Sequence, residues 1–176
     1  YKRPDLTKEV IDEDSWFHTG DIGEFCGKDN SFLRITDRKK EMFKTSGGKY
    51  IAPQLMENKF KESRFIEQIM VIGESQKHPA ALVVPAFEFM MEWCKRKGYG
   101  CSSNAEMIEN PKVIARIQED IDEYNKGFGS WEQIKKFELI DHVWGIDTGE
   151  LTPTLKLKRK QIKAKYQHLI DKIYGN

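Results

Sequence analysis

Four short polar clusters in this 176-residue chain hold the side chains that could do chemistry. Three lie early in the chain, as Thr19-Gly20-Asp21, Asp37-Arg38-Lys39-Lys40 and Lys44-Thr45-Ser46-Gly47-Gly48. The fourth, residues 152–159, has a lysine within a stretch rich in threonine and basic residues near the end. Carboxylates, an arginine, bare glycine backbone and a spaced lysine suit ribose hydroxyls, phosphates and an acyl phosphate.

The first two clusters offer a carboxylate and a guanidinium. An ionised Asp21 accepts hydrogen bonds with two oxygens, so it could bind both vicinal hydroxyls of a ribose. Arg38 presents a planar fork of donors to ribose or phosphate oxygens. Each cluster also has a plain structural interpretation, since Gly20-Asp21 is a common turn and a charged run often faces water. We prefer the solvated turn for Lys39 and Glu41.

The third cluster combines donors with glycine backbone. Lys44, Thr45, Ser46, Gly47 and Gly48 could form a phosphate-binding or amide-lined channel. The spacing is not that of a Walker loop, which needs a lysine and a Ser or Thr directly after the second glycine. A glycine-rich hairpin tip is an equal alternative.

The fourth cluster places Lys156 in a loop before a basic helix. A lysine on a mobile loop could neutralise charge that develops on a phosphoryl or carboxylate oxygen. Lys158 is a nearby rival for that role. A solvated basic helix start is the alternative, and we prefer it for Lys160, Lys163 and Lys165.

Composition excludes several classes of function. The chain has 29 basic and 28 acidic residues, and aromatic residues do not interleave with the basic run, so the sequence predicts no nucleic-acid partner. The three cysteines lack a CxxC pair and the four histidines are scattered, so we expect reduced thiols and no metal site. No apolar run approaches the roughly 20 residues of a membrane span. We expect a cytoplasmic protein and leave open a peripheral association of a longer protein with a membrane.

The hydrophobic pattern mixes strand-like and helix-like segments, which is typical of an α+β protein. Residues 1–14 are predicted to be irregular. Strands are expected over 16–25, 31–36, 41–45, 69–72, 80–84 and near 137–139, with a turn over 27–30 and a loop over 147–154. Four helices are expected: from Pro53, along a stripe from Phe87 to Cys94, from Pro111, and along a last stripe ending at Ile173.

The predicted elements divide the chain at residues 37–40. The strands before this point are too few to hold a hydrophobic core. Residues 39–176 contain enough helices and strands for an independent domain of ordinary size.

Three stretches in a fixed order resemble the adenylate-forming superfamily. They are Trp16-Phe17-His18-Thr19-Gly20-Asp21, Asp37-Arg38-Lys39-Lys40-Glu41-Met42-Phe43-Lys44 and Tyr50-Ile51-Ala52-Pro53. The superfamily contains acyl-CoA synthetases, peptide-synthetase adenylation domains and firefly luciferase. The ending 151–159 is similar to the long-chain fatty acyl-CoA synthetase branch. Most other branches have glycine before the key lysine, where this chain has Leu155, and that departure also leaves Lys158 as a rival.

The resemblance implies a role for each cluster. Asp21 and Arg38 would bind the ribose hydroxyls of ATP and of the acyl-adenylate. Lys40 would be the hinge about which the C-terminal domain rotates. Lys156 would contact the carboxylate and the α-phosphate in the first half-reaction, and residues 44–48 would line the CoA pantetheine channel in the second.

The resemblance also implies a whole enzyme, an AMP-forming long-chain fatty acid–CoA ligase. Residues 1–38 would end its large N-terminal AMP-binding domain, and residues 39–176 would be a small mobile C-terminal domain with a short β-hairpin and a mixed sheet packed by helices. ATP and CoA would be substrates together with a fatty acid. Mg²⁺ and the acyl pocket would lie in the N-terminal domain, the partner of this one. We therefore expect the chain alone to fold without ligase activity.

Two alternatives stay open. The chain could belong to another adenylating enzyme of the superfamily, such as an acyl carrier protein ligase. It could also be a non-enzymatic α+β module that binds anions.

Overall fold

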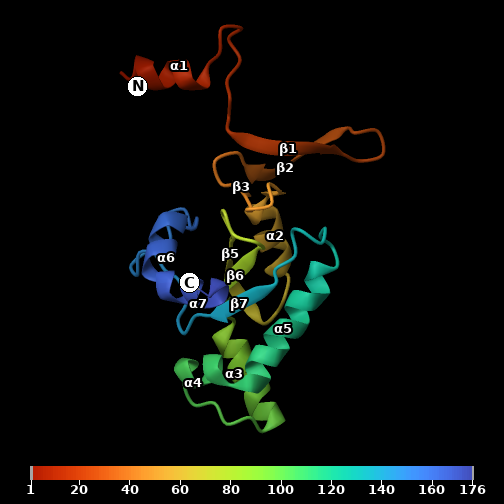
Figure 1. The fold of residues 1–176 in the computed structure, drawn as a ribbon, viewed down its shortest axis with the longest axis vertical. Coiled ribbons are helices and arrows are strands. Elements are labelled where there is room, and N and C mark those ends of the chain that lie inside the picture. Colours follow the sequence, from red (N-terminus) through yellow and green to blue (C-terminus); the bar gives the residue numbers. More distant parts are fainter. Residues whose placement is uncertain (1, 176) are drawn as a thin grey trace.

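A computed structural model describes residues 2–175 and shows a mixed α+β fold, as the sequence predicts (Figure 1). The chain forms helices and strands in this order: α1 (Pro4–Val10), β1 (Asp21–Cys26), β2 (Phe32–Arg38), β3 (Phe43–Lys44), β4 (Tyr50–Ile51), α2 (Pro53–Phe60), β5 (Ile66–Ile72), β6 (Ala80–Pro85), α3 (Phe87–Lys97), α4 (Asn104–Glu109), α5 (Pro111–Asn125), β7 (Lys136–Leu139), α6 (Arg159–Lys165) and α7 (Gln167–Tyr174).

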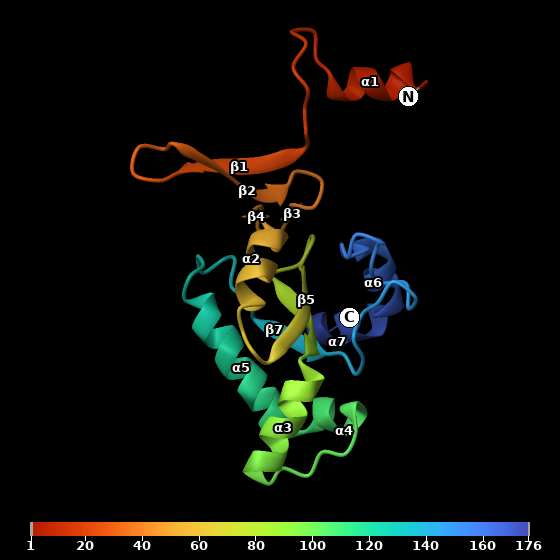
Figure 2. The same ribbon diagram turned by 180° about the vertical axis from the view of Figure 1, so that it is seen from behind.

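A three-stranded mixed sheet forms the centre of the molecule. β6 pairs with β5 antiparallel and with β7 parallel. Every residue of β6 is buried, which explains its uninterrupted apolar sequence. The sheet lies between α2 and α5 on one side and α6 and α7 on the other (Figures 1 and 2). The predicted helix starts at Pro53 and Pro111 and the predicted strands over 69–72 and 80–84 are confirmed.

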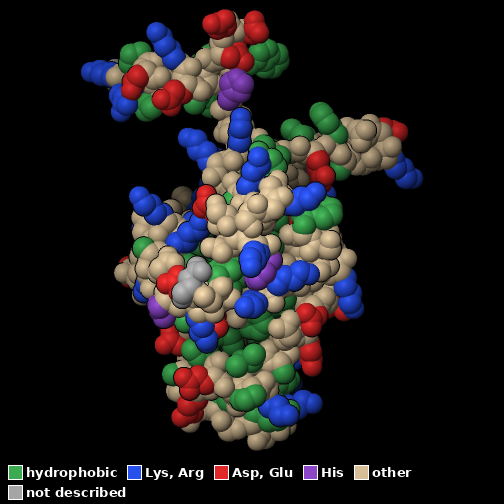
Figure 3. Space-filling view, in the orientation of Figure 1, with side chains coloured by type: hydrophobic (Ala, Val, Ile, Leu, Met, Phe, Trp, Pro, Cys, Tyr) green, Lys and Arg blue, Asp and Glu red, His purple; other side chains and the backbone are tan. Residues whose placement is uncertain are grey.

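The N-terminal residues stand apart from this core. α1 and the β1–β2 hairpin extend away from the body of the molecule, and Figure 3 shows hydrophobic side chains at their surface. Trp16, Phe25 and Phe32 are 73%, 70% and 68% exposed. The buried hydrophobic residues run from Ile51 to Ile173. The core therefore belongs to the part after residues 37–40, while the division into domains 1–38 and 39–176 stays a prediction.

The N-terminal segment also departs from two of our expectations. Residues 4–10 form a helix rather than an irregular segment, because Pro4 and Asp5 stand in its first turn, where both residue types are favourable. Strand β1 begins at Asp21 and not near Trp16, because Gly20 takes a left-handed backbone (φ +76°) that interrupts an extended chain.

Two further departures concern helices. α4 was not predicted, although its start has a capping signal: Ser103 Oγ accepts from the backbone N–H of Glu106 at 3.2 Å. The single last helix is in fact α6 and α7, separated at Tyr166, where the backbone leaves the helical region (φ −109°, ψ 25°). The prediction of four helices was therefore wrong for the later part of the chain.

The structure predicts unequal stability along the chain. The β1–β2 hairpin has two free edges and little buried area, whereas β6 is buried along its whole length. Backbone amides in residues 2–36 should exchange about 100-fold faster than those in 66–140, because local opening is easier where few apolar groups are buried. Hydrogen exchange measured by NMR checks this. Equal protection of the two regions would show that residues 2–36 are an integral part of the core domain.

Candidate functional site

Asp21 and Arg38 lie side by side at the open end of the β1–β2 hairpin. They are cross-strand partners, and Arg38 Nε lies 2.7 Å from Asp21 Oδ1. Asp21 Oδ1 is buried, yet it receives no aligned hydrogen bond within residues 2–175. The backbone N–H of Asp21 donates to Thr19 Oγ1 at 3.1 Å, which fixes the turn before the strand. We call these two residues the ribose pair after the role that the resemblance implies, and that role stays a prediction. An acceptor beside a fork of donors is an arrangement that would fit a sugar diol.

Lys40 lies between two anchored neighbours. The backbone N–H of Lys39 donates to Gly20 O at 2.8 Å, which attaches Lys39 to the start of β1. Glu41 Oε2 accepts from Arg159 Nε at 3.0 Å, which attaches Glu41 to the start of α6. Lys40 itself is exposed, in a tight turn where the N–H groups of Glu41 and Met42 donate to the carbonyl of Arg38. The turn at Lys40 is thus attached on both sides, and the role of Lys40 as a hinge stays a prediction.

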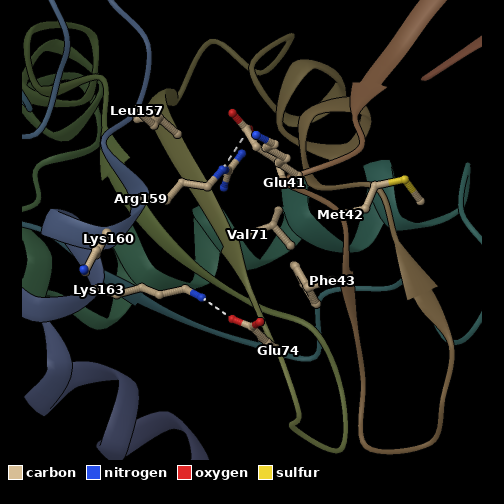
Figure 4. Close-up of a pocket in the computed structure, with 10 residues that line it drawn as sticks. Glu41, Met42, Phe43, Val71, Glu74, Leu157, Arg159, Lys160 and Lys163 are labelled. Atoms are coloured by element: carbon tan, nitrogen blue, oxygen red, sulfur yellow. Dashed lines mark hydrogen bonds and ion pairs between the residues drawn. The ribbon is translucent and has the colours of Figure 1, made fainter. Parts of the chain in front are cut away.

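A buried charged cluster of Arg159, Glu57 and Glu41 holds α6 against α2. Arg159 donates Nη1 and Nη2 to the two oxygens of Glu57 at 2.8 and 2.7 Å. Glu57 also accepts from the backbone N–H of Val71 at 2.8 Å. Figure 4 shows Arg159 reaching from α6 toward Glu41. The prediction that Glu41 is a solvated turn residue was wrong, because its carboxylate is the third anchor of this arginine.

Burial and ion pairing act in opposite directions on this cluster. Burial raises the pKa of Glu57, and its hydrogen bonds and charge interaction with Arg159 offset part of that shift. A carboxylate that accepts three donors at these distances is held in its ionised form by its neighbours.

One local signal in the sequence points to this cluster. Glu57 lies three residues before Phe60, so both share the buried face of α2, and an acidic residue on a buried face needs a partner. Its partner Arg159 was hidden within a run of basic residues.

Lys156 closes a tight loop, residues 152–156, which we call the lysine loop. Leu151 and Leu157 form an antiparallel bridge at its base. The backbone N–H of Thr152 donates to Lys156 O at 2.8 Å, and that of Lys156 donates to Thr152 Oγ1 at 3.0 Å. The Lys156 side chain is exposed, and it has no ion-pair partner among residues 2–175.

Leu155 occupies the position before that lysine with a left-handed backbone (φ +58°). This region favours glycine, so the turn has the geometry that glycine would adopt freely. Leu155 therefore has a backbone that glycine would adopt at lower steric cost. Lys158, the rival lysine, lies instead at the base of the loop, where it precedes α6 and its backbone N–H donates to Glu150 O at 2.8 Å.

A second buried carboxylate supports the base of the lysine loop. Glu150 Oε1 accepts from Lys165 Nζ at 2.5 Å and from the Tyr166 hydroxyl at 3.2 Å. Burial opposes ionisation of Glu150, but hydrogen bonds, led by that from Lys165, lower its pKa to about 2. Lys165 is exposed and Lys163 is partly exposed, as expected for a basic helix that faces water, and each also has an ion-pair partner. The Nζ of Lys163 donates to Glu74 at 2.9 Å. Lys160 is exposed, as expected.

The loop of residues 45–48, which we call the glycine loop, is the tip of the β3–β4 hairpin. Thr45 is buried and its backbone N–H donates to Lys49 O at 3.0 Å. The N–H of Ser46 donates to Gln76 O at 2.9 Å, which ties the tip to the β5–β6 turn. Gly48 has a left-handed backbone (φ +76°). The glycine-rich hairpin tip is thus confirmed as the local structure, and a role in binding CoA stays a prediction.

The turn at Lys40 and the residues after the lysine loop meet around one groove. A groove of about 540 Å³ is bordered by Lys40, Glu41 and Phe43 on one side and by Leu157, Arg159 and Lys160 on the other (Figure 4). This turn and the base of the lysine loop therefore face each other. The ribose pair and the glycine loop lie outside this lining.

Residues 2–175 contain no group of His, Cys, Asp or Glu side chains that could hold a metal ion. All three cysteines are free thiols. Within the same residues, no helix is long and apolar enough to cross a membrane.

Comparison with known proteins identifies the family. The AMP-binding enzyme C-terminal domain family matches residues 41–176, and the chain belongs to that family. It is 39% identical over 177 residues to long-chain-fatty-acid–CoA ligase 1 of Cavia porcellus and to the Homo sapiens protein of that name. These alignments cover 99% of this chain and 25% of each relative, so the chain spans about a quarter of their length.

Solved structures agree with this assignment. The adenylation domain of a carboxylate reductase from Mycobacterium chelonae has a TM-score of 0.80 and 28% identity, over 100% of this chain and 26% of that one. The corresponding domain from Segniliparus rugosus, in complex with AMP and a carboxylic acid, has a TM-score of 0.78 and 27% identity, over 99% and 26%. The resemblance inferred from sequence motifs is therefore confirmed at the level of the superfamily.

The backbone of Leu155 leads to a testable prediction. Leu155→Gly should leave the free energy of unfolding unchanged or raise it by up to about 1 kcal/mol, because glycine adopts this backbone without steric cost. Leu155→Val should lower it by about 1–2 kcal/mol, since a β-branched residue tolerates positive φ least. The side chain is 70% exposed, so neither change removes packing. Urea unfolding measures both values, and an equal loss in the two variants would contradict the expectation.

Glu150 predicts a pH dependence. Its pKa is lowered to about 2 in the folded chain, so its stabilising effect is complete above the unfolded value and is lost as pH falls from about 5 to 2. Urea unfolding should show wild type losing on the order of 3 kcal/mol more than Glu150→Gln over this range. Glu67→Gln, a change at an exposed site, should behave as wild type. Parallel pH profiles for wild type and Glu150→Gln would contradict the assignment.

Proposed function

We propose that the chain is the C-terminal part of an AMP-forming long-chain fatty acid–CoA ligase. The observation that carries the proposal is the ribose pair: an acceptor and a donor fork held together directly before an exposed turn at Lys40. The identity of 39% to long-chain-fatty-acid–CoA ligases over nearly the whole chain supports the choice of substrates. ATP, a fatty acid and CoA are the substrates that this function requires.

The proposed reaction has two balanced steps. A fatty-acid carboxylate oxygen attacks the α-phosphorus of ATP, and pyrophosphate leaves to give acyl-AMP. The CoA thiol then attacks the acyl carbonyl, loses its proton, and displaces AMP. Asp21 accepts from the ribose hydroxyls and Arg38 donates to ribose oxygens in both steps, so the nucleotide keeps its position while the acyl group changes partner.

Lys156 would act in the first step. Its ammonium is a compact charge on a flexible stem and has no ion-pair partner within residues 2–175. It would contact the carboxylate and the α-phosphate oxygens and stabilise the negative charge that gathers there. Lys158 is less suited, because its backbone is fixed at the start of α6.

The second step would use the glycine loop. The flat backbone around Gly47 and Gly48, with Lys44, Thr45 and Ser46 beside it, would line the passage of the CoA pantetheine arm. A rotation about Lys40 would bring Lys156 to the reaction centre in the first step and the glycine loop to it in the second. The reaction centre would stay the same while the residues around it change.

The proposal requires a larger N-terminal domain that ends with residues 1–38. The exposed side chains of Trp16, Phe25 and Phe32 would be covered by it. Mg²⁺ belongs there too, since the described part of this chain offers no ligand group for a metal. We place the whole enzyme in the cytoplasm, and a peripheral contact with a membrane would suit its fatty-acid substrate.

A carrier-protein ligase is the second candidate. It is favoured by one observation: an adenylation–carrier-protein didomain of a carboxylic acid reductase from Segniliparus rugosus has a TM-score of 0.72 and 28% identity. ATP-dependent acyl transfer by the full-length enzyme, assayed with CoA and with acyl carrier protein, separates the candidates. Formation of acyl-CoA supports our proposal, and transfer to the carrier protein alone overturns it.

Lys156 provides a mutational test in the full-length enzyme. Lys156→Ala should reduce acyl-adenylate formation on the order of 10²–10³-fold, because one positioned charged donor is lost at the reaction centre. Conversion of supplied acyl-AMP and CoA to acyl-CoA should change far less. Pyrophosphate release and thioester formation measure the two steps separately.

Lys158→Ala is the matched control and should be milder in both steps. A selective first-step defect in Lys158→Ala would instead assign the role to that lysine. Equal losses of both steps in Lys156→Ala would remove support for two domain orientations.

A further inference from the structure

We propose that Asp37 is a latch that holds the chain in the domain orientation seen here, an inference that rests on the proposed hinge at Lys40. Asp37 is fully buried near the end of β2. Its Oδ2 accepts from the backbone N–H of Gln54 at 3.0 Å, and its Oδ1 accepts from the backbone N–H of Arg38 at 2.6 Å. The bond from Gln54 joins the hairpin before the hinge to helix α2 after it, while the bond from Arg38 lies within β2.

Helix α2 depends on this carboxylate for its N-terminal cap. The residue at the N-cap position is Ala52, which has no side-chain acceptor, and Pro53 follows it. Gln54 thus has the first helical N–H group that needs a partner. Asp37 supplies it from 17 residues upstream, and a carboxylate at this end also matches the helix dipole.

The latch can exist in only one domain orientation. Asp37 precedes Lys40 and Gln54 follows it, so a rotation about Lys40 carries the carboxylate away from the helix. The charged cluster of Arg159, Glu57 and Glu41 lies wholly after Lys40 and would rotate as a unit. Asp37 is therefore a positioning residue, since its bond to Gln54 contributes to one orientation and is absent from the other.

The test in the full-length enzyme compares the two half-reactions. Asp37→Asn keeps the shape of the side chain but replaces one acceptor oxygen with an NH₂ donor. The ratio of the acyl-adenylate rate to the thioester rate should change about five- to tenfold, as expected for loss of a helix cap. The rate of the half-reaction that uses the latched orientation should fall, whereas the rate of the other half-reaction should stay the same or rise. An equal fall of both rates would show a merely structural role and overturn the latch.

A second measurement uses this chain alone and does not depend on ligase activity. Residual dipolar couplings report whether residues 21–38 and 51–173 share one alignment tensor. Wild type should show one common tensor, and Asp37→Asn should show two. The same change on the exposed face of α5, Asp122→Asn, should leave one tensor.

A common tensor in Asp37→Asn, or separate tensors in wild type, would overturn the latch. Circular dichroism first confirms that the variant is folded. If Asp37→Asn does not fold, Asp37→Ser, whose side chain keeps a shorter acceptor, is used in its place. The same outcomes then apply to Asp37→Ser. If Asp37→Asn shows two tensors in this chain but the full-length enzyme has no ligase activity, the latch is supported and the proposed function is overturned.

Discussion

The position of the lysine loop depends on the buried charged cluster of Arg159, Glu57 and Glu41. Arg159 begins α6, directly after the loop, and its guanidinium is shared between a glutamate of α2 and one that follows the hinge turn. Charged side chains that are shielded from water stabilise a structure only while all their partners are present. Removal of one partner from a buried ion pair lowers the free energy of unfolding by about 3–5 kcal/mol. The cluster thus connects Glu41, helix α2 and the lysine loop as parts of one rigid body.

This rigidity matters for the rotation that we propose about Lys40. Such a rotation would reposition Lys156 accurately only if that lysine is fixed relative to the axis of rotation. Glu150 adds a second support on the far side of the loop, through Lys165 and Tyr166. The two carboxylates hold the residues that flank the loop, while the Lys156 side chain stays exposed, which suits the role that we propose for this lysine.

Local signals in the sequence were sufficient for much of the fold. Pro53 and Pro111 marked helix starts, and the apolar runs of β5 and β6 marked buried strands. The pairing of Asp21 with Arg38 was not predicted, because an irregularity between Ile22 and Gly23 shifts the register of the β1–β2 hairpin. Local reasoning failed for the charged residues, because Glu41 and Glu57 lie 118 and 102 residues from the arginine that they bind. A periodic pattern cannot distinguish a solvated lysine or glutamate from one whose partner lies so far along the chain.

The parallel pairing of β6 with β7 has a consequence for the order of folding. Ala80 lies opposite Lys136, and α3, α4 and α5 come between the two strands in the chain. Closing so long a loop costs conformational entropy before the strand contacts compensate it. We therefore expect the antiparallel β5–β6 pair to form first during folding. The terminal helix meets the sheet only after β7 joins, since Lys136 Nζ donates to Ile173 O at 2.8 Å. The β6–β7 pair and the docking of α7 are thus expected to form after the β5–β6 hairpin.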